Sequence, residues 1–303
     1  MIIEEYTFYN CTNLEFLSNL YNLTTIKSYA FYNCYNLKNI SNLNNLTTLG
    51  YSVFYNCSSL KELHCLYSLK NIKVNYDDKY WNSFYYESPF KGSSFEYLYD
   101  LNSLEIIPDY AFYKCDKLKG IYNLTKLTSI GKQAFRYCYN LTDINTMSHL
   151  ISIGELAFSS CSKFNGTLDF YNDVNISQYA FSSCHLIKEV IFRGSIISVQ
   201  SYSFSQIANI SIYHPIKLYS TIVNNKENID IYYYGKAVPL NDTGSNNLIY
   251  SIASNVYVLC DYKSTEFYGH EVKYLSCKIN KLTKIIDTTT KISFLDLFCC
   301  LNN

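Results

Sequence analysis

The sequence predicts a β-dominated solenoid in which coils of roughly 23 residues stack along one axis. Three observations support this: a cysteine that recurs at a fixed period, a phenylalanine three positions before it, and further apolar columns in the same register. A period of this length is typical of repeat proteins, because each unit packs on the next one. The pairs are Phe8 and Cys11, Phe31 and Cys34, Phe54 and Cys57, Phe112 and Cys115, Phe135 and Cys138, Phe158 and Cys161, and Phe181 and Cys184.

Two further units extend the array to nine, although they lack the cysteine. One period after Phe181 lies Phe204, with Ile207 in the place of the cysteine. One period before Phe112, the same arithmetic gives Pro89 and Gly92.

Other apolar residues recur three, six, nine and fifteen positions after the cysteine, as Leu37, Ile40, Leu43 and Leu49 do after Cys34. Counting in this way also places Thr167 and Arg193 in two of these columns. An apolar residue at every third position fits neither a regular strand nor a long helix. A coil this short cannot bury its own apolar side, but stacked coils bury each other's.

Each coil should therefore contain two extended pieces and one compact turn. We expect one strand around Leu37 to Ile40 and a second short extended piece around Leu46 to Leu49, with equivalents in every coil. The Ala-Phe-x-x-Cys stretch should form a helical or 3₁₀ turn whose phenylalanine fills the core.

Two stretches carry a resemblance to a known family: "SIGKQAFRYCYNLTDI" (Ser129 to Ile144) and "SIGELAFSSC" (Ser152 to Cys161). They resemble the BspA-like leucine-rich repeats of surface-antigen type, whose pattern is Ile-Gly, two variable residues, Ala-Phe, two variable residues, Cys, and then spaced Leu and Ile. One departure is that a pair such as Asn-Leu replaces the family's usual Pro after the Ile-rich strand. The resemblance implies a leucine-rich-repeat solenoid of the α/β horseshoe-like class. It also implies a surface or secreted protein that binds other proteins in adhesion.

The predicted organisation is a repeat array over residues 1–210, a degenerate last coil with a C-terminal β cap over 211–275, and a tail over 276–303. The cap rests on resemblance too. "IYYYGKAVP" (Ile231 to Pro239) and "NVYVLCDYKSTEFYGHEV" (Asn255 to Val272) are similar to the closing segment of many such proteins from protists.

An insertion interrupts the array, because the separation of Cys57 and Gly92 exceeds one period by about half a period. The extra residues fall at about 75–86, and insertions in repeats often form loops on the binding face. Aromatic residues are favoured anchors in protein interfaces. The alternative is that the loop folds its aromatic side chains back over the coil edge. The candidate contact residues in this loop are Tyr80, Trp81, Phe84 and Tyr85.

No catalytic, cofactor or metal site is predicted. The five histidines are scattered, and no nucleophile elbow, phosphate-binding loop or closely spaced pair of Cys ligands occurs. A disulfide ladder between neighbouring coils would suit the expected spacing. A column of buried free thiols is the preferred interpretation, because Ile207 fills the same position.

Composition limits the partners. Lys+Arg and Asp+Glu are both 25, which gives no basic surplus for nucleic acid, and no apolar run is long enough for a membrane span. Tyrosine, at 33 residues, and asparagine are overused, which we attribute mainly to the base composition of the gene. The expected partner is a protein, bound to outward positions on the strand-bearing face that are mixed in charge. The candidates there are Lys38, Lys61, Glu62, Lys119 and Asp143.

Three functions remain open: adhesion at a cell surface, intracellular scaffolding, and a structural module of a larger surface chain. The start Met1-Ile2-Ile3 does not resemble a signal peptide, which favours the cytoplasmic alternative, whereas the family resemblance favours the surface. Ile3 falls in the column of Ile26, so the first coil is expected to lack a polar cap. An uncapped end predicts self-association or a longer array.

Overall fold

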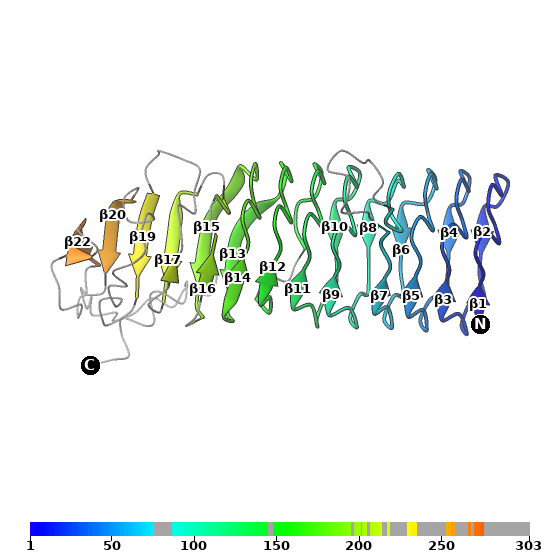
Figure 1. Ribbon diagram of the computed structural model, residues 1–303, viewed down its shortest axis with the longest axis horizontal. Helices are drawn as coiled ribbons and strands as arrows, with labels where there is room; N and C mark the ends of the chain where they lie inside the picture. The colour runs from blue at the N-terminus through cyan, green and yellow to red at the C-terminus, as the bar shows by residue number, and fades with distance from the viewer. Residues whose placement is uncertain are drawn as a thin grey trace, which may run out of the picture.

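The protein is a parallel β-solenoid of about nine coils, as shown by a computed structural model (Figure 1). The structure describes residues 1–75, 87–144, 148–194, 197–200, 202–204, 207–213, 217–218, 229–234, 253–258, 266–267 and 270–275. Each regular coil contributes two short strands. We call the surface formed by the strands that follow the cysteine the first-strand face, and the surface formed by the strands that precede the next phenylalanine the second-strand face.

Strands of successive coils pair in parallel within sheets, and each face consists of more than one sheet. Those of the first-strand face are β2 (Phe16–Leu17), β4 (Asn39–Ile40), β6 (Glu62–Leu63), β8 (Tyr97–Leu98), β10 (Gly120–Ile121), β13 (Asn165–Phe170), β15 (Leu186–Phe192), β17 (Asn209–Ile212), β19 (Ile229–Tyr233), β20 (Ala253–Val258) and β22 (His270–Tyr274). An antiparallel strand, β21 (Glu266–Phe267), pairs with β22. Those of the second-strand face are β1 (Ile2–Ile3), β3 (Thr25–Ile26), β5 (Thr48–Leu49), β7 (Asn71–Ile72), β9 (Ile106–Ile107), β11 (Ser129–Ile130), β12 (Ser152–Ile153), β14 (Val174–Ile176), β16 (Ile197–Val199) and β18 (Lys217–Leu218).

The apolar columns form one continuous core along the axis. Residues one period apart are direct neighbours, as in the pairs Ile3 with Ile26 and Ile130 with Ile153. The phenylalanine rings stack one above another through all nine coils, with centroids 4.8 to 6.4 Å apart. The predicted core is therefore confirmed, and its coils bury each other's apolar sides as expected.

The prediction of a helical or 3₁₀ turn at Ala-Phe-x-x-Cys is wrong, because the described residues there form consecutive tight turns and no helix. Alternate N–H groups of this stretch donate to two kinds of acceptor, carbonyl groups of the same turn and carbonyl groups of the next coil. The N–H groups of Ala30, Tyr32 and Cys34 bond three residues back in their own turn, whereas those of Tyr29, Phe31 and Asn33 bond to the next coil. Tyr29 and Asn33 also have φ near +60°, which a right-handed helix does not allow. Half of the donors thus join neighbouring coils.

Two predicted column positions are off by one residue. Phe90, not Pro89, stacks between Phe54 and Phe112, so that Ser93 takes the place of the cysteine in that coil. The unit beginning at Phe90 is accordingly one residue shorter than the regular period. No spacing rule reveals such a compensation, because the insertion before Phe90 hides it.

The second correction concerns Thr167 and Arg193, which lie outside the apolar columns. Leu168 and Phe192 fill those positions, at 2% and 0% exposed. The pairing of β13 with β15 contains a bulge between Gly166 and Thr167, and these two strands are six and seven residues long, whereas the preceding strands have two. Longer strands alternate inward and outward with a period of two, which replaces the period of three.

The first-strand sheet continues without interruption from β13 through β22, across residue 210. The boundary between array and cap at 210–211 therefore stays a prediction, and the tail at 276–303 lies outside the described residues.

Candidate binding surfaces

The charged residues predicted to bind a partner lie on the first-strand face, where the lysines pair with glutamates one coil away along the solenoid axis. Lys38 binds Glu15 at 2.8 Å, and Glu96 lies between Lys119 at 2.6 Å and Lys61 at 3.8 Å. The hydrogen bond from Lys119 holds the pKa of Glu96 below its usual range. Because these are exposed pairs, they set the pattern of charge on the face more than they stabilise the coils.

Glu62 and Asp143 are also exposed on this face. Glu62 lies 3.2 Å from the ring nitrogen Nε2 of His64, while Asp143 forms an isolated parallel bridge with Gly120. The structure thus places all five charged candidates on the first-strand face.

A group of aromatic rings adjoins these charges. Tyr97 lies in β8, Tyr99 follows it, Tyr122 follows β10, and His64 follows β6, so that three adjacent coils bring them together. The His64 and Tyr99 rings stack with centroids 4.5 Å apart, and Tyr99 and Tyr122 with centroids 5.3 Å apart. The Nζ atom of Lys119 lies 5.7 Å from the Tyr97 ring centroid. We call the three tyrosines together with His64 the tyrosine cluster.

Sequence reasoning missed the tyrosine cluster, although a signal was present. Tyr99 and Tyr122 are one full period apart, so the period alone predicts that they stack. The three tyrosines are half-buried and held on strands or directly after them. Rigid aromatic side chains beside exposed charges are the composition that dominates the binding energy of protein interfaces.

The aromatic loop candidates Tyr80, Trp81, Phe84 and Tyr85 lie outside the described residues. The base of the insertion is described: Asn75 and Glu87 pair as an antiparallel bridge. The Tyr29 hydroxyl donates a hydrogen bond to Glu87 at 2.8 Å. Burial, followed by this bond to a carboxylate, raises the pKa of Tyr29.

From Cys34 on, the cysteine column is buried, and its thiols are free and hydrogen-bonded to the backbone. The Cys57 thiol donates to the Phe31 carbonyl of the previous coil at 3.1 Å, and the same carbonyl accepts the Cys34 N–H. The same contact recurs at Cys34, Cys138, Cys161 and Cys184 at 3.0 to 3.1 Å. Burial raises the pKa of Cys34 to about 11 and that of Cys138 well above its ordinary value. These thiols are therefore structural donors and poor nucleophiles.

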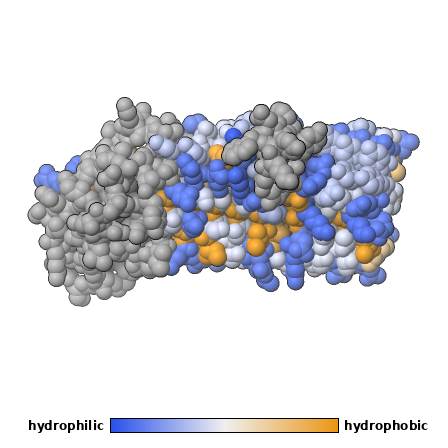
Figure 2. Space-filling view, viewed as in Figure 1, coloured by the Kyte–Doolittle hydropathy of each residue, from blue (hydrophilic) through white to orange (hydrophobic). Residues whose placement is uncertain are grey.

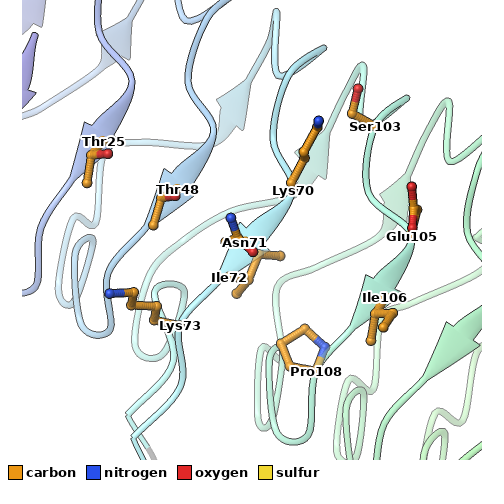
Figure 3. Close-up of a pocket in the computed structure, with 10 residues that line it drawn as sticks. All are labelled: Thr25, Thr48, Lys70, Asn71, Ile72, Lys73, Ser103, Glu105, Ile106 and Pro108. Carbon is orange, nitrogen blue, oxygen red and sulfur yellow. The ribbon is translucent and has the colours of Figure 1, made fainter.

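The second-strand face carries a groove between β7 and β9, with a volume of about 670 Å³ (Figure 3). Its lining residues are Thr25, Thr48, Lys70, Asn71, Ile72, Lys73, Ser103, Glu105, Ile106 and Pro108. Apolar surface, drawn in orange, is exposed on the middle coils in the lower half of Figure 2, and the Ile106 side chain is 56% exposed. None of the candidate binding residues predicted from the sequence lines this groove.

Within the part of the chain that the structure describes, no three His, Cys, Asp or Glu side chains gather in a way that could hold a metal ion. In the same residues, no helix is long and apolar enough to cross a membrane.

The first coil, at the end where we expected self-association, packs less tightly than the coils after it. Phe8, Cys11, Leu14 and Leu17 are only partly buried there, whereas their equivalents one period later are fully buried. Self-association through this coil stays a prediction.

The match to a family of repeat proteins agrees with this architecture. The BspA-type leucine-rich repeat region matches in six copies, over residues 1–76, 85–211 and 168–277. Among solved structures, a leucine-rich repeat protein from Bacteroides ovatus is 15% identical, with 91% of this chain and 88% of that one covered and a TM-score of 0.38. A leucine-rich cell surface protein from Faecalibacterium prausnitzii is 16% identical, with 90% and 82% covered and a TM-score of 0.45. No curated protein matches the sequence. Since the family model matches most of its length, the chain belongs to the BspA-type leucine-rich repeat family.

Proposed function

We propose that this chain is a non-catalytic recognition module that binds a protein partner in adhesion at a cell surface. A repeat protein of this family is typically a binding scaffold with a role in protein interaction. The single observation that carries the proposal is the tyrosine cluster on the first-strand face. Its rings lie beside the charges of Lys61, Glu62 and Lys119, all of them on short strands or next to them.

The chemistry of this face favours a polar protein surface. The charges alternate along the axis and largely neutralise one another, so long-range steering of a partner is weak. The tyrosine rings would supply most of the affinity, since each offers a large apolar area and a hydroxyl at a low cost in side-chain entropy. Intracellular scaffolding is the alternative, and it predicts the same kind of face in another compartment.

Two measurements test the proposal. Antibody against the chain should label intact cells, whereas labelling that requires permeabilisation would support the intracellular alternative. Beads coated with the purified chain should then adhere to cells or to immobilised extracellular proteins. The Tyr97→Ala/Tyr99→Ala double variant should weaken this adhesion by about tenfold or more, because each anchor lost in an interface costs about 2 kcal/mol.

The matched control removes two tyrosines elsewhere. Tyr35 and Tyr139 are 41% and 47% exposed and lie outside the tyrosine cluster. The Tyr35→Ala/Tyr139→Ala variant should adhere like the unchanged chain. Equal adhesion by both double variants would refute the role of the cluster.

A further inference from the structure

The groove on the second-strand face is a seam between two sheets. The first sheet ends at β7, and the next begins at β9, although the coils of β6, β8 and β10 stay paired on the other face. At regular junctions the Ile26 carbonyl accepts the Gly50 N–H of the next coil, and the Ile107 carbonyl accepts that of Gly131, both at 2.8 Å. By this register, the main-chain groups of Ile72 and Ile106 face the seam.

Pro108 explains the interruption. It occupies the position of Gly50 and Gly131, and it has no N–H to donate to Ile72. Glycine is not required at this position, because Lys73 and Ser177 occupy it in other coils and donate to the previous coil at 2.8 and 2.9 Å. The missing N–H is therefore what distinguishes Pro108.

The seam carries three charged side chains. Lys70 and Lys73 flank β7, and Glu105 precedes β9; among the residues that the structure describes, none of these side chains has a salt bridge or hydrogen bond. Two other lysines of the solenoid do bind a carboxylate on an adjacent coil: Lys27 binds Glu4, and Lys132 binds Glu155 at 3.0 Å. The two seam lysines extend from β7 in Figure 3, on the side of the groove opposite Glu105.

We propose that the seam binds an extended peptide segment of a partner protein, which pairs with the free edge of β7 and directs acidic side chains toward Lys70 and Lys73. Unpaired N–H and C=O groups on a strand edge are a template for another strand. Adding a peptide strand to such an edge is a recurring mode of recognition, in which the main chain supplies affinity and the side-chain positions supply specificity. The two lysines favour an acidic segment, and Ile106 offers an apolar contact on the opposite wall. This inference extends the proposed role in protein recognition to a second surface.

A library of random peptides displayed on phage, selected against the full chain, tests the inference. The enriched sequences should be β-prone and acidic. A synthetic peptide from this set should lose binding when alternate backbone amides are N-methylated, since strand pairing needs those N–H groups. On the protein, binding should slow hydrogen exchange at the Ile72 amide and leave that of Ile130, which is paired within its sheet, unchanged.

Charge reversal supplies the variants. Lys70→Glu/Lys73→Glu should weaken peptide binding by about tenfold, while the control Lys117→Glu/Lys163→Glu, outside both proposed binding surfaces, should bind normally. All four side chains are exposed, so the fold should be retained, and circular dichroism checks this. Absence of acidic β-prone sequences, or binding that is insensitive to both N-methylation and the seam variant, would overturn the inference. Peptides whose binding depends on Tyr97 and Tyr99 would overturn it too, yet would support the proposed function. Normal seam binding without cell adhesion would refute the proposed function alone.

Discussion

Truncating one ring of the phenylalanine stack tests the architecture most directly. Phe135 is completely buried, and its ring lies 5.0 Å from both Phe112 and Phe158, with interplanar angles of 4° and 13°. Replacing a buried Phe by Ala costs about 3–5 kcal/mol in the free energy of unfolding. Because Phe135 loses stacked partners on both sides, each pair worth about 0.5–1.5 kcal/mol, we expect Phe135→Ala to reach about 4–5 kcal/mol.

The matched control is Phe8→Ala at the first coil. Phe8 is only partly buried and stacks on Phe31 alone, so its loss should cost about half as much. Urea denaturation followed by far-ultraviolet circular dichroism measures the free energy of unfolding of both variants. The loss for Phe135→Leu should be smaller than that for Phe135→Ala, because leucine keeps much of the side-chain volume. A Phe135→Ala variant that unfolds at the same urea concentration as Phe8→Ala would refute the idea of a continuous core.

Three further changes probe the contacts between coils. Gly154→Ala should destabilise the chain by about 1–3 kcal/mol in the same assay, because its Cβ would lie 2.5 Å from backbone atoms of the previous coil. Gly120→Ala should destabilise it less, because the nearest atoms to a Cβ on Gly120 belong to a tyrosine side chain. Asn33→Ala should lower the free energy of unfolding by about 1–3 kcal/mol, because Asn33 combines a φ of 60° with a side-chain hydrogen bond to the equivalent asparagine one coil back. Asn33→Gly should lower it less, since glycine adopts this φ without strain, and equal losses for the two variants would contradict the role of the positive φ. Burial raises the pKa of Cys138 above its unfolded value of about 8.5. The contribution of this thiol to the free energy of unfolding should therefore be complete below that pH and fall above it. Cys138→Val should reduce the slope of the free energy of unfolding against pH by about 1.4 kcal/mol per pH unit, measured by denaturation between about pH 8 and 10.5.

The core could be predicted because a fixed period turns separation along the chain into contact in space. Ile3 and Ile26 are one period apart along the chain and face each other in the sheet. Where the spacing changes, counting fails. At the bulge in the pairing of β13 with β15, the column falls on Phe192 and not on Arg193, and Arg193 instead binds Asp169 through two hydrogen bonds at 2.7 and 3.0 Å. Counting by a fixed period cannot detect a single extra residue when an apolar side chain is possible at either of two neighbouring positions.

The abundance of asparagine is explained in part by the repeat. Part of the excess of asparagine has a structural reason, since Asn10, Asn33 and Asn56 all have positive φ at the same position of successive coils. Asparagine tolerates this region better than most residues. Their side chains form a ladder, with hydrogen bonds of 2.9 and 3.0 Å. A repeated conformation therefore selects a repeated residue, independently of the base composition of the gene.

The candidate sites differ in how far the sequence could reveal them. The five charged residues of the first-strand face follow from the register, and so, in hindsight, do the stacked rings of Tyr99 and Tyr122. The seam does not, because it arises from what Pro108 lacks. In the sequence, Pro108 is simply the residue that follows an apolar strand. Only the structure shows that the other coils pair through the N–H at this position, and that the lack of this N–H in proline opens the sheet. A repeat protein can thus create a local binding edge by one substitution in the strand register, while the stack of phenylalanine rings continues beneath it from Phe90 to Phe112.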